Sequence, residues 1–184
     1  QGGDGGMEYP MATLLIGPGL GTVFHEWMHS WYQMMLGTNE SMYAWMDEGF
    51  TEFATDRTQA FLRNDTNFAH RPNYSGYYSL VRSGREEPLT THADHFNTNL
   101  AYGNAVYSKG CVFLSQLGYI AGEENLAKIM LEYYRLWRFK HPNANDLMRV
   151  AEDISGIQLD WYKEYWVSTT KTIDYKIDSL WEEN

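Results

Sequence analysis

The sequence contains a single cysteine, Cys111, among its 184 residues. One cysteine cannot form an intramolecular disulfide, and from this count we expect no cysteine-based zinc site. No apolar run approaches the roughly 18 residues that cross a bilayer, and no charged-then-apolar signal peptide opens the chain. We therefore expect a soluble protein without a membrane partner, whose compartment the sequence leaves unknown.

Basic residues are also scarce: the chain has 14 Lys and Arg and 24 Asp and Glu, which gives a formal net charge of -10. A nucleic-acid partner would need clustered Lys and Arg for phosphate contacts, so we expect none. Hydrophobic residues make up 43% of the chain and aromatic residues 16%, enough apolar surface to offset the entropy of ordering it. The composition therefore indicates one folded domain of ordinary size.

The chain reads as a mostly helical domain over residues 1–172. Its first six residues are glycine-rich and look like the interior of a longer protein, so we expect an excised fragment. The run from Met11 to Ile16, between a proline and a glycine, predicts a strand. Apolar residues at helical spacing predict helices at about 22–36, 44–62, 106–120, 123–139, 145–154 and 159–166.

Two stretches have no helical period. Residues 64–99 contain Pro72, Pro88 and several Gly and Asn, which predicts a long irregular segment of the kind that often carries function. Thr172 to Ile177 predicts a further strand, and residues 173–184 could open a truncated following segment.

The clearest functional signal is HEWMH at residues 25–29. His25 and His29 are four apart on a predicted helix, so both imidazoles lie on one face, where a single ion can bridge them. A catalytic zinc site takes three protein ligands and keeps one position for water. Glu48, nineteen residues beyond His29 on the next predicted helix, supplies the third ligand. The pattern predicts one zinc ion held by His25, His29 and Glu48, with Glu26 beside it as general base.

A ligand histidine usually donates its second N–H to a carboxylate or a carbonyl. Glu52, one helical turn after Glu48, is our candidate for that partner, and a surface glutamate is an equally good reading of it. The other histidines, among them His92 and His95, lie in polar sequence without periodicity. We do not expect them to form a second metal site.

These residues resemble the gluzincin zinc aminopeptidases, the family of alanyl aminopeptidase and leukotriene-A hydrolase. HEWMH followed by DEGF at 47–50 is similar to the family's zinc signature, with Asp47 where the family usually has Asn. GGMEY at 5–9 is similar to the upstream G-x-M-E-N block, and YSKG at 107–110 to the downstream Y-x-K-G block. The family often has a carboxylate seven residues after the zinc glutamate, where this chain has Thr55.

The resemblance implies an α+β, thermolysin-like zinc metallopeptidase domain with a small mixed β-sheet. It also implies a role for each block: Glu8 would bind the free amino group of a peptide substrate, and Tyr107 would stabilise the tetrahedral intermediate. Taken alone, Tyr107 would usually be a core aromatic, and Glu8 would be a turn residue at least as often. Family members carry further N- and C-terminal domains, so we expect the parent chain to have them.

Three functions remain open at this stage. The leading one is a zinc-dependent aminopeptidase that removes N-terminal residues from peptides through a zinc-activated water, favoured by Glu8. The second is a thermolysin-type endopeptidase, which shares the zinc site but needs no amine-binding carboxylate. The third is an inactive peptide-binding domain of the same fold, disfavoured because ligands, base and tyrosine are all present.

Overall fold

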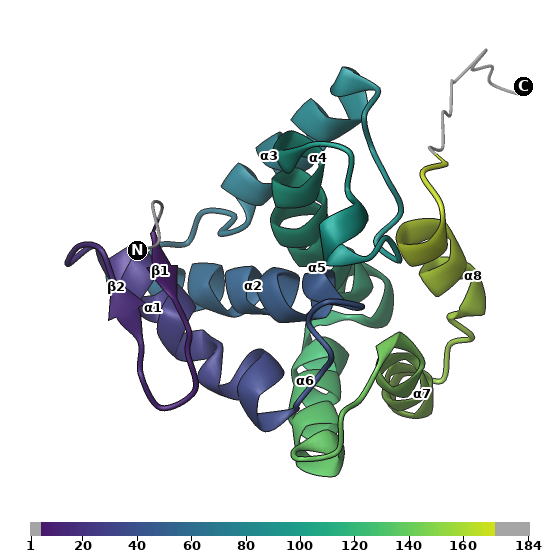
Figure 1. The fold of residues 1–184 in the computed structure, drawn as a ribbon. Helices are drawn as coiled ribbons and strands as arrows, with labels where there is room; N and C mark the ends of the chain where they lie inside the picture. The colour runs from purple at the N-terminus through teal and green to yellow at the C-terminus, as the bar shows by residue number, and fades with distance from the viewer. Residues whose placement is uncertain (1–4, 172–184) are drawn as a thin grey trace, which may run out of the picture.

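A computed structural model describes residues 5–171 of the chain. Helices dominate, as expected, and Figure 1 shows α2 crossing the middle of the molecule with α1 and the two short strands at one end. The helices are α1 (Leu20–Met28), α2 (Ala44–Arg63), α3 (Arg71–Ser83), α4 (Asn99–Gly103), α5 (Gly110–Ala121), α6 (Glu123–Trp137), α7 (Ala144–Ser155) and α8 (Asp160–Lys163).

The sheet of the described residues is one antiparallel pair. Strand β1 (Gly6–Met7) pairs with β2 (Leu14–Leu15), with Gly6 opposite Leu15 and Met7 opposite Leu14. The expected mixed sheet is therefore wrong within residues 5–171, and the expected strand from Met11 to Ile16 forms only at Leu14–Leu15. The strand predicted at 172–177 and the segment 173–184 lie outside the described residues.

The helix that carries HEWMH does not run straight to residue 36 as its periodicity predicts. α1 ends at Met28 and a wider, π-helical segment follows over Ser30–Met35. Within it Tyr32 and Gln33 leave helical geometry, and Gln33 has a φ of 97°. The chain therefore changes direction at Tyr32 and Gln33, soon after His29.

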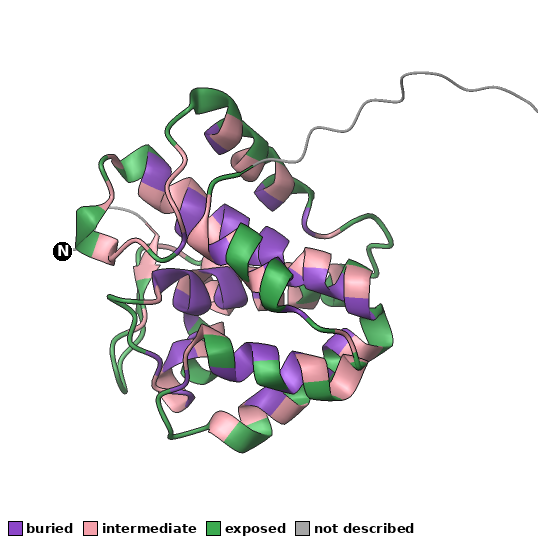
Figure 2. Ribbon diagram, turned by 90° about the vertical axis from the view of Figure 1, so that its right-hand side faces the viewer, coloured by how far each residue is buried: buried purple, intermediate pink, exposed green. Residues whose placement is uncertain are grey.

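α2 is the scaffold of the site, and its predicted bounds are confirmed to within a residue or two. Its aromatic side chains Trp45, Phe50 and Phe53 are buried, and they belong to the same core as Phe113 of α5 and Tyr133 of α6. Figure 2 shows buried residues on the inner faces of the helices and exposed residues on their outer faces. The hydrophobic core thus holds one face of α2 while its opposite side is free to carry polar groups.

The prediction of an irregular segment over residues 64–99 is wrong, because α3 lies within it. Pro72 sits in the first turn of α3, where a proline removes no helical hydrogen bond, and Gly84 ends the helix in the left-handed conformation. His70 stands at its N-cap position and is buried. Within residues 5–171, every helix is too short or too polar to span a bilayer.

Candidate metal centre

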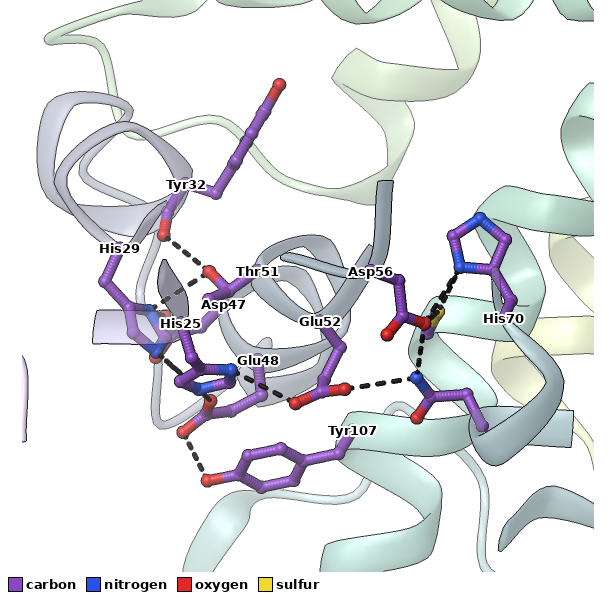
Figure 3. Close-up of polar contacts among 12 residues, drawn as sticks. His25, His29, Tyr32, Asp47, Glu48, Thr51, Glu52, Asp56, His70 and Tyr107 are labelled. Carbon is purple, nitrogen blue, oxygen red and sulfur yellow. Dashed lines mark hydrogen bonds and ion pairs between the residues drawn. The ribbon is translucent and has the colours of Figure 1, made fainter. Parts of the chain in front are cut away.

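Three predicted ligand side chains converge between α1 and α2. His25 Nε2 lies 3.0 Å from Glu48 Oε2, and His29 Nε2 lies 3.2 Å from the same oxygen. The two imidazole Nε2 atoms are 3.1 Å apart. Figure 3 shows both rings turned toward Glu48. The structure therefore brings together all three residues that the sequence selected as ligands.

This triangle of atoms fits a zinc ion. Tetrahedral ligand atoms about 2.0–2.1 Å from zinc stand roughly 3.3–3.4 Å from one another. The three observed separations of 3.0, 3.1 and 3.2 Å are only slightly shorter. Small outward movements of the side chains would therefore give the ligand spacing of a zinc site, with the cleft side left for water.

The other nitrogen of each imidazole faces a carboxylate on α2. His25 Nδ1 lies 3.1 Å from Glu52 Oε1, and His29 Nδ1 lies 2.6 Å from Asp47 Oδ1. A carboxylate at these distances favours a proton on each Nδ1, which leaves both Nε2 lone pairs aimed at Glu48. The structure thus brings Glu52 to His25 in the position expected for an outer partner of a ligand.

The donor set itself calls for a cation. With both Nδ1 atoms protonated, the two Nε2 lone pairs and a Glu48 carboxylate oxygen face one another with no hydrogen between them. If both Nε2 atoms were protonated instead, their two N–H groups would point at each other. Burial lowers the pKa of His25, but its bonds to Glu48 and Glu52 outweigh this and raise that pKa to about 9. Burial raises the pKa of Glu48, and the histidine bonds still bring it down to about 2. Positive charge is stabilised at this point, as a metal site requires.

Glu26, the predicted general base, is buried beside the ligands and lines the same cleft. Its Oε2 atom has no hydrogen-bond partner within residues 5–171. Burial, as the largest cause, raises the pKa of its carboxyl group. The backbone of Gly6 passes so close that an added Cβ would lie 2.4 Å from Glu26 Oε1. Glu26 therefore has one unsatisfied oxygen in a confined place, which suits a group that accepts a proton from water.

Tyr107 reaches the site from the opposite side, out of the π-helical segment Asn104–Lys109. Its hydroxyl donates to Glu48 Oε1 over 2.6 Å, and its ring stacks 5.9 Å from that of His25. Burial and the Glu48 charge raise the pKa of the phenol well above its usual range. Tyr107 therefore stays protonated and acts as a hydrogen-bond donor at the metal centre.

Glu8 follows β1 and lines the cleft with the ligands. One carboxylate oxygen of Glu8 lies within 4.8 Å of ligand-type atoms of both His29 and Asp47. The cleft has a volume of about 580 Å³, and seven of its 21 lining residues are Asp or Glu. None of these described lining residues is Lys or Arg. An acidic cleft of this kind favours cationic groups.

Sequence reasoning missed three residues of this site. Asp47 appeared only as a departure from a family pattern, yet it pairs with His29. Thr51 Oγ1 lies 3.2 Å from His29 Nδ1, and Asn73 Nδ2 donates to Glu52 Oε2 over 3.1 Å. Helical spacing from Glu48 could have indicated Thr51, whereas Asn73 comes from α3, a helix that the sequence did not predict.

Comparisons with known proteins concern the family and the fold of the chain. The family model for the peptidase family M1 domain matches residues 20–166. Aminopeptidase N of Streptomyces lividans is 23% identical over 154 residues, which are 80% of this chain and 18% of that protein. Aminopeptidase B of Rattus norvegicus is 26% identical over 183 residues, 91% of this chain and 26% of that one. The chain thus spans about a quarter or less of the length of these relatives.

Solved structures share the fold. The M1 zinc metallopeptidase of Deinococcus radiodurans superposes with a TM-score of 0.75 at 14% sequence identity, covering 92% of this chain and 38% of that one. A variant of that enzyme bound to a Tyr-Ser-Ala substrate gives a TM-score of 0.72 over 88% of this chain. At this identity the likeness concerns the fold.

Proposed function

This chain belongs to peptidase family M1, and from that premise we propose that it is the catalytic part of a zinc aminopeptidase of thermolysin-like arrangement. The observation that carries the proposal is the compact triangle of His25, His29 and Glu48, whose edges measure 3.0, 3.1 and 3.2 Å. Relatives of this chain are named as aminopeptidases, among them leucine aminopeptidase 2 of Chaetomium globosum. Its substrates are peptides with a free N-terminus.

The three ligands would hold one zinc ion, which when bound lowers the pKa of a water ligand and polarises a carbonyl. Glu26 accepts a proton from the attacking water at its unpaired Oε2 and returns it to the leaving amine. When substrate is bound, the Tyr107 hydroxyl turns from Glu48 and donates a hydrogen bond to the oxygen on which negative charge develops. Glu52 and Asp47 fix the orientation of the two ligand imidazoles.

Glu8 sets the exopeptidase character. The α-amino group of a peptide has a pKa near 8 and is largely protonated at neutral pH. A carboxylate near the ligands, as Glu8 is, can pair with this ammonium and align the first peptide bond with the metal centre. An endopeptidase would bind a chain that continues through the cleft and would have no use for this anion.

A comparison of free and blocked substrates tests the proposal. The unmutated protein should cleave an aminoacyl reporter much faster than its N-acetylated form. Glu8→Gln should lower kcat/KM for the free substrate about 10- to 100-fold, the size expected for a charged hydrogen bond of about 1.5–3 kcal/mol, and should leave the blocked substrate unaffected.

Glu40→Gln is the matched control, because Glu40 lines the same cleft and carries the same charge. Equal losses of kcat/KM in the two variants would show that the effect comes from the overall negative charge of the cleft and not from a specific amine site. Equal cleavage of free and blocked substrates by the unmutated protein would refute the aminopeptidase and favour the endopeptidase. Zinc retained in full by Glu48→Ala would refute the ligand assignment.

A further inference from the structure

A second group of ligand-type side chains lies deeper in the molecule. It consists of Asp56 on α2, His70 at the start of α3 and Cys111 on α5, and the sequence places these residues far apart. His70 is 5% exposed and Cys111 is fully buried. Each residue therefore comes from a different helix, and the three meet where those helices pack together.

We propose that Asp56, His70 and Cys111 form a second metal site for a zinc-like divalent cation, which ties α2, α3 and α5 together. Nitrogen, oxygen and sulfur ligands about 2.0–2.3 Å from a tetrahedral ion stand roughly 3.4–3.6 Å apart. His70 Nδ1 is 3.0 Å from Asp56 Oδ2, and Cys111 Sγ is 3.5 Å from that nitrogen and 3.9 Å from that oxygen. Shifts of about 0.4 Å would bring all three separations to the expected values.

The mixture of donors selects the type of ion. A thiolate, an imidazole and a carboxylate together suit zinc or cobalt, whereas magnesium and calcium prefer oxygen ligands alone. The thiolate and the carboxylate also supply two negative charges for a divalent ion. The ring of His70 is already held in place, because it stacks on Phe53 at 4.6 Å with an interplanar angle of 14°.

The contacts indicate which protons move when the ion binds. Without the ion, His70 Nδ1–H donates to Asp56, and burial raises the pKa of Cys111 so that its thiol stays neutral. Ion binding moves the His70 proton from Nδ1 to Nε2 and releases the thiol proton to solvent. One proton therefore leaves per ion bound.

The ion has a route to the site. Asp56 lines the acidic cleft together with Thr55 and Gln59, and its side chain is 14% exposed. A divalent cation that enters the cleft can reach Asp56, and a water from the same cleft can complete four-fold coordination. Asn73 connects the two centres, since its Nδ2 donates to both Asp56 Oδ2 and Glu52 Oε2, at 2.9 and 3.1 Å.

Cobalt titration of the metal-free protein tests the second site, because only this site offers a sulfur ligand. The unmutated chain should bind two equivalents of Co²⁺, and one of them should give a near-ultraviolet thiolate-to-cobalt absorption band. Cys111→Ser should abolish the band and reduce the stoichiometry to one. Asp56→Asn, which keeps the side-chain shape, should weaken the second equivalent while circular dichroism stays unchanged.

Two further variants separate the sites. Glu48→Ala should lose the first equivalent and keep the thiolate band, so a failure of the aminopeptidase assignment leaves this test intact. His92→Asn, at a histidine outside both groups, should still bind two equivalents. A single equivalent in the unmutated chain, or a second equivalent that persists unchanged in Cys111→Ser, would overturn the proposal.

Discussion

Two glycines from separate sequence blocks meet where α2 crosses α5. A Cβ added to Gly49 would lie 2.6 Å from Gly110 Cα, 2.7 Å from its carbonyl carbon and 3.0 Å from Val106 O. All three are backbone atoms, so no side chain can rotate away to make room. In Gly49→Ala, α2 must therefore move away from α5.

The expected change in the free energy of unfolding combines two opposing effects. Alanine in place of glycine favours a helix by about 1 kcal/mol, and forced overpacking costs about 1–3 kcal/mol or more. Because the contact involves rigid backbone, we expect a net loss of about 1–2 kcal/mol. For a chain of this size that corresponds to a fall in Tm of roughly 2–8 °C. Catalysis should fall as well, because Glu48 is the neighbouring residue and its 2.6 Å bond to Tyr107 spans the same crossing.

Thermal unfolding of the zinc-saturated protein, followed by circular dichroism, measures the effect. Gly103→Ala is the matched control, because Gly103 is also helical and an added Cβ there meets no atom within 4 Å. The control should be neutral or stabilised by up to about 1 kcal/mol. If Gly49→Ala is as stable and as active as the control, the close crossing does not position Glu48.

Three other substitutions test the assigned roles. Glu26→Gln should keep its metal while kcat falls about 100-fold or more, and metal loss would contradict the general-base role. Tyr107→Phe should lower kcat with little change in KM, and a change in KM alone would exclude it from catalysis. Lys109→Met should destabilise the fold by about 3–5 kcal/mol in urea unfolding, because Glu86, 2.7 Å from Lys109 Nζ, would remain buried without its partner. Adding Glu86→Gln should recover part of that loss, and no recovery would show that the pair itself is unimportant.

The sequence predicts helices well where one apolar face meets the core. α6 and α7 were confirmed within about two residues, since their buried residues recur at helical spacing and glycines precede or follow them. α3 was missed because Pro72 and Gly76 look like breakers. Gly76 is instead a packing residue, where an added Cβ would lie 2.4 Å from Ser108 Oγ. Such a helix is specified by its packing against a neighbouring segment, and the local sequence pattern does not contain that information.

More of the metal centre than of the fold could be predicted from the sequence. Four-residue spacing on one helix and a glutamate on the next already select His25, His29 and Glu48 without tertiary information. The break at Tyr32 and Gln33 could not be predicted, because helical periodicity continues through residue 36 while Gln33 adopts a positive φ. Asn73 could not be predicted either, since its bond to Glu52 joins two helices that are distant in sequence.

One helix, α2, supplies most of what defines the metal centre. Glu48 is the proposed third ligand, Asp47 and Glu52 lie at the Nδ1 atoms of the two histidines, and Thr51 lies beside His29. Positions 47, 48, 51 and 52 share one helical face, so they move as a unit. A displacement of α2 therefore moves Glu48 and the Nδ1 partners together, away from His25 and His29. Because the core on the opposite face holds α2 in place, we expect changes in packing at Phe50 and Gly49 to shift these polar residues as well.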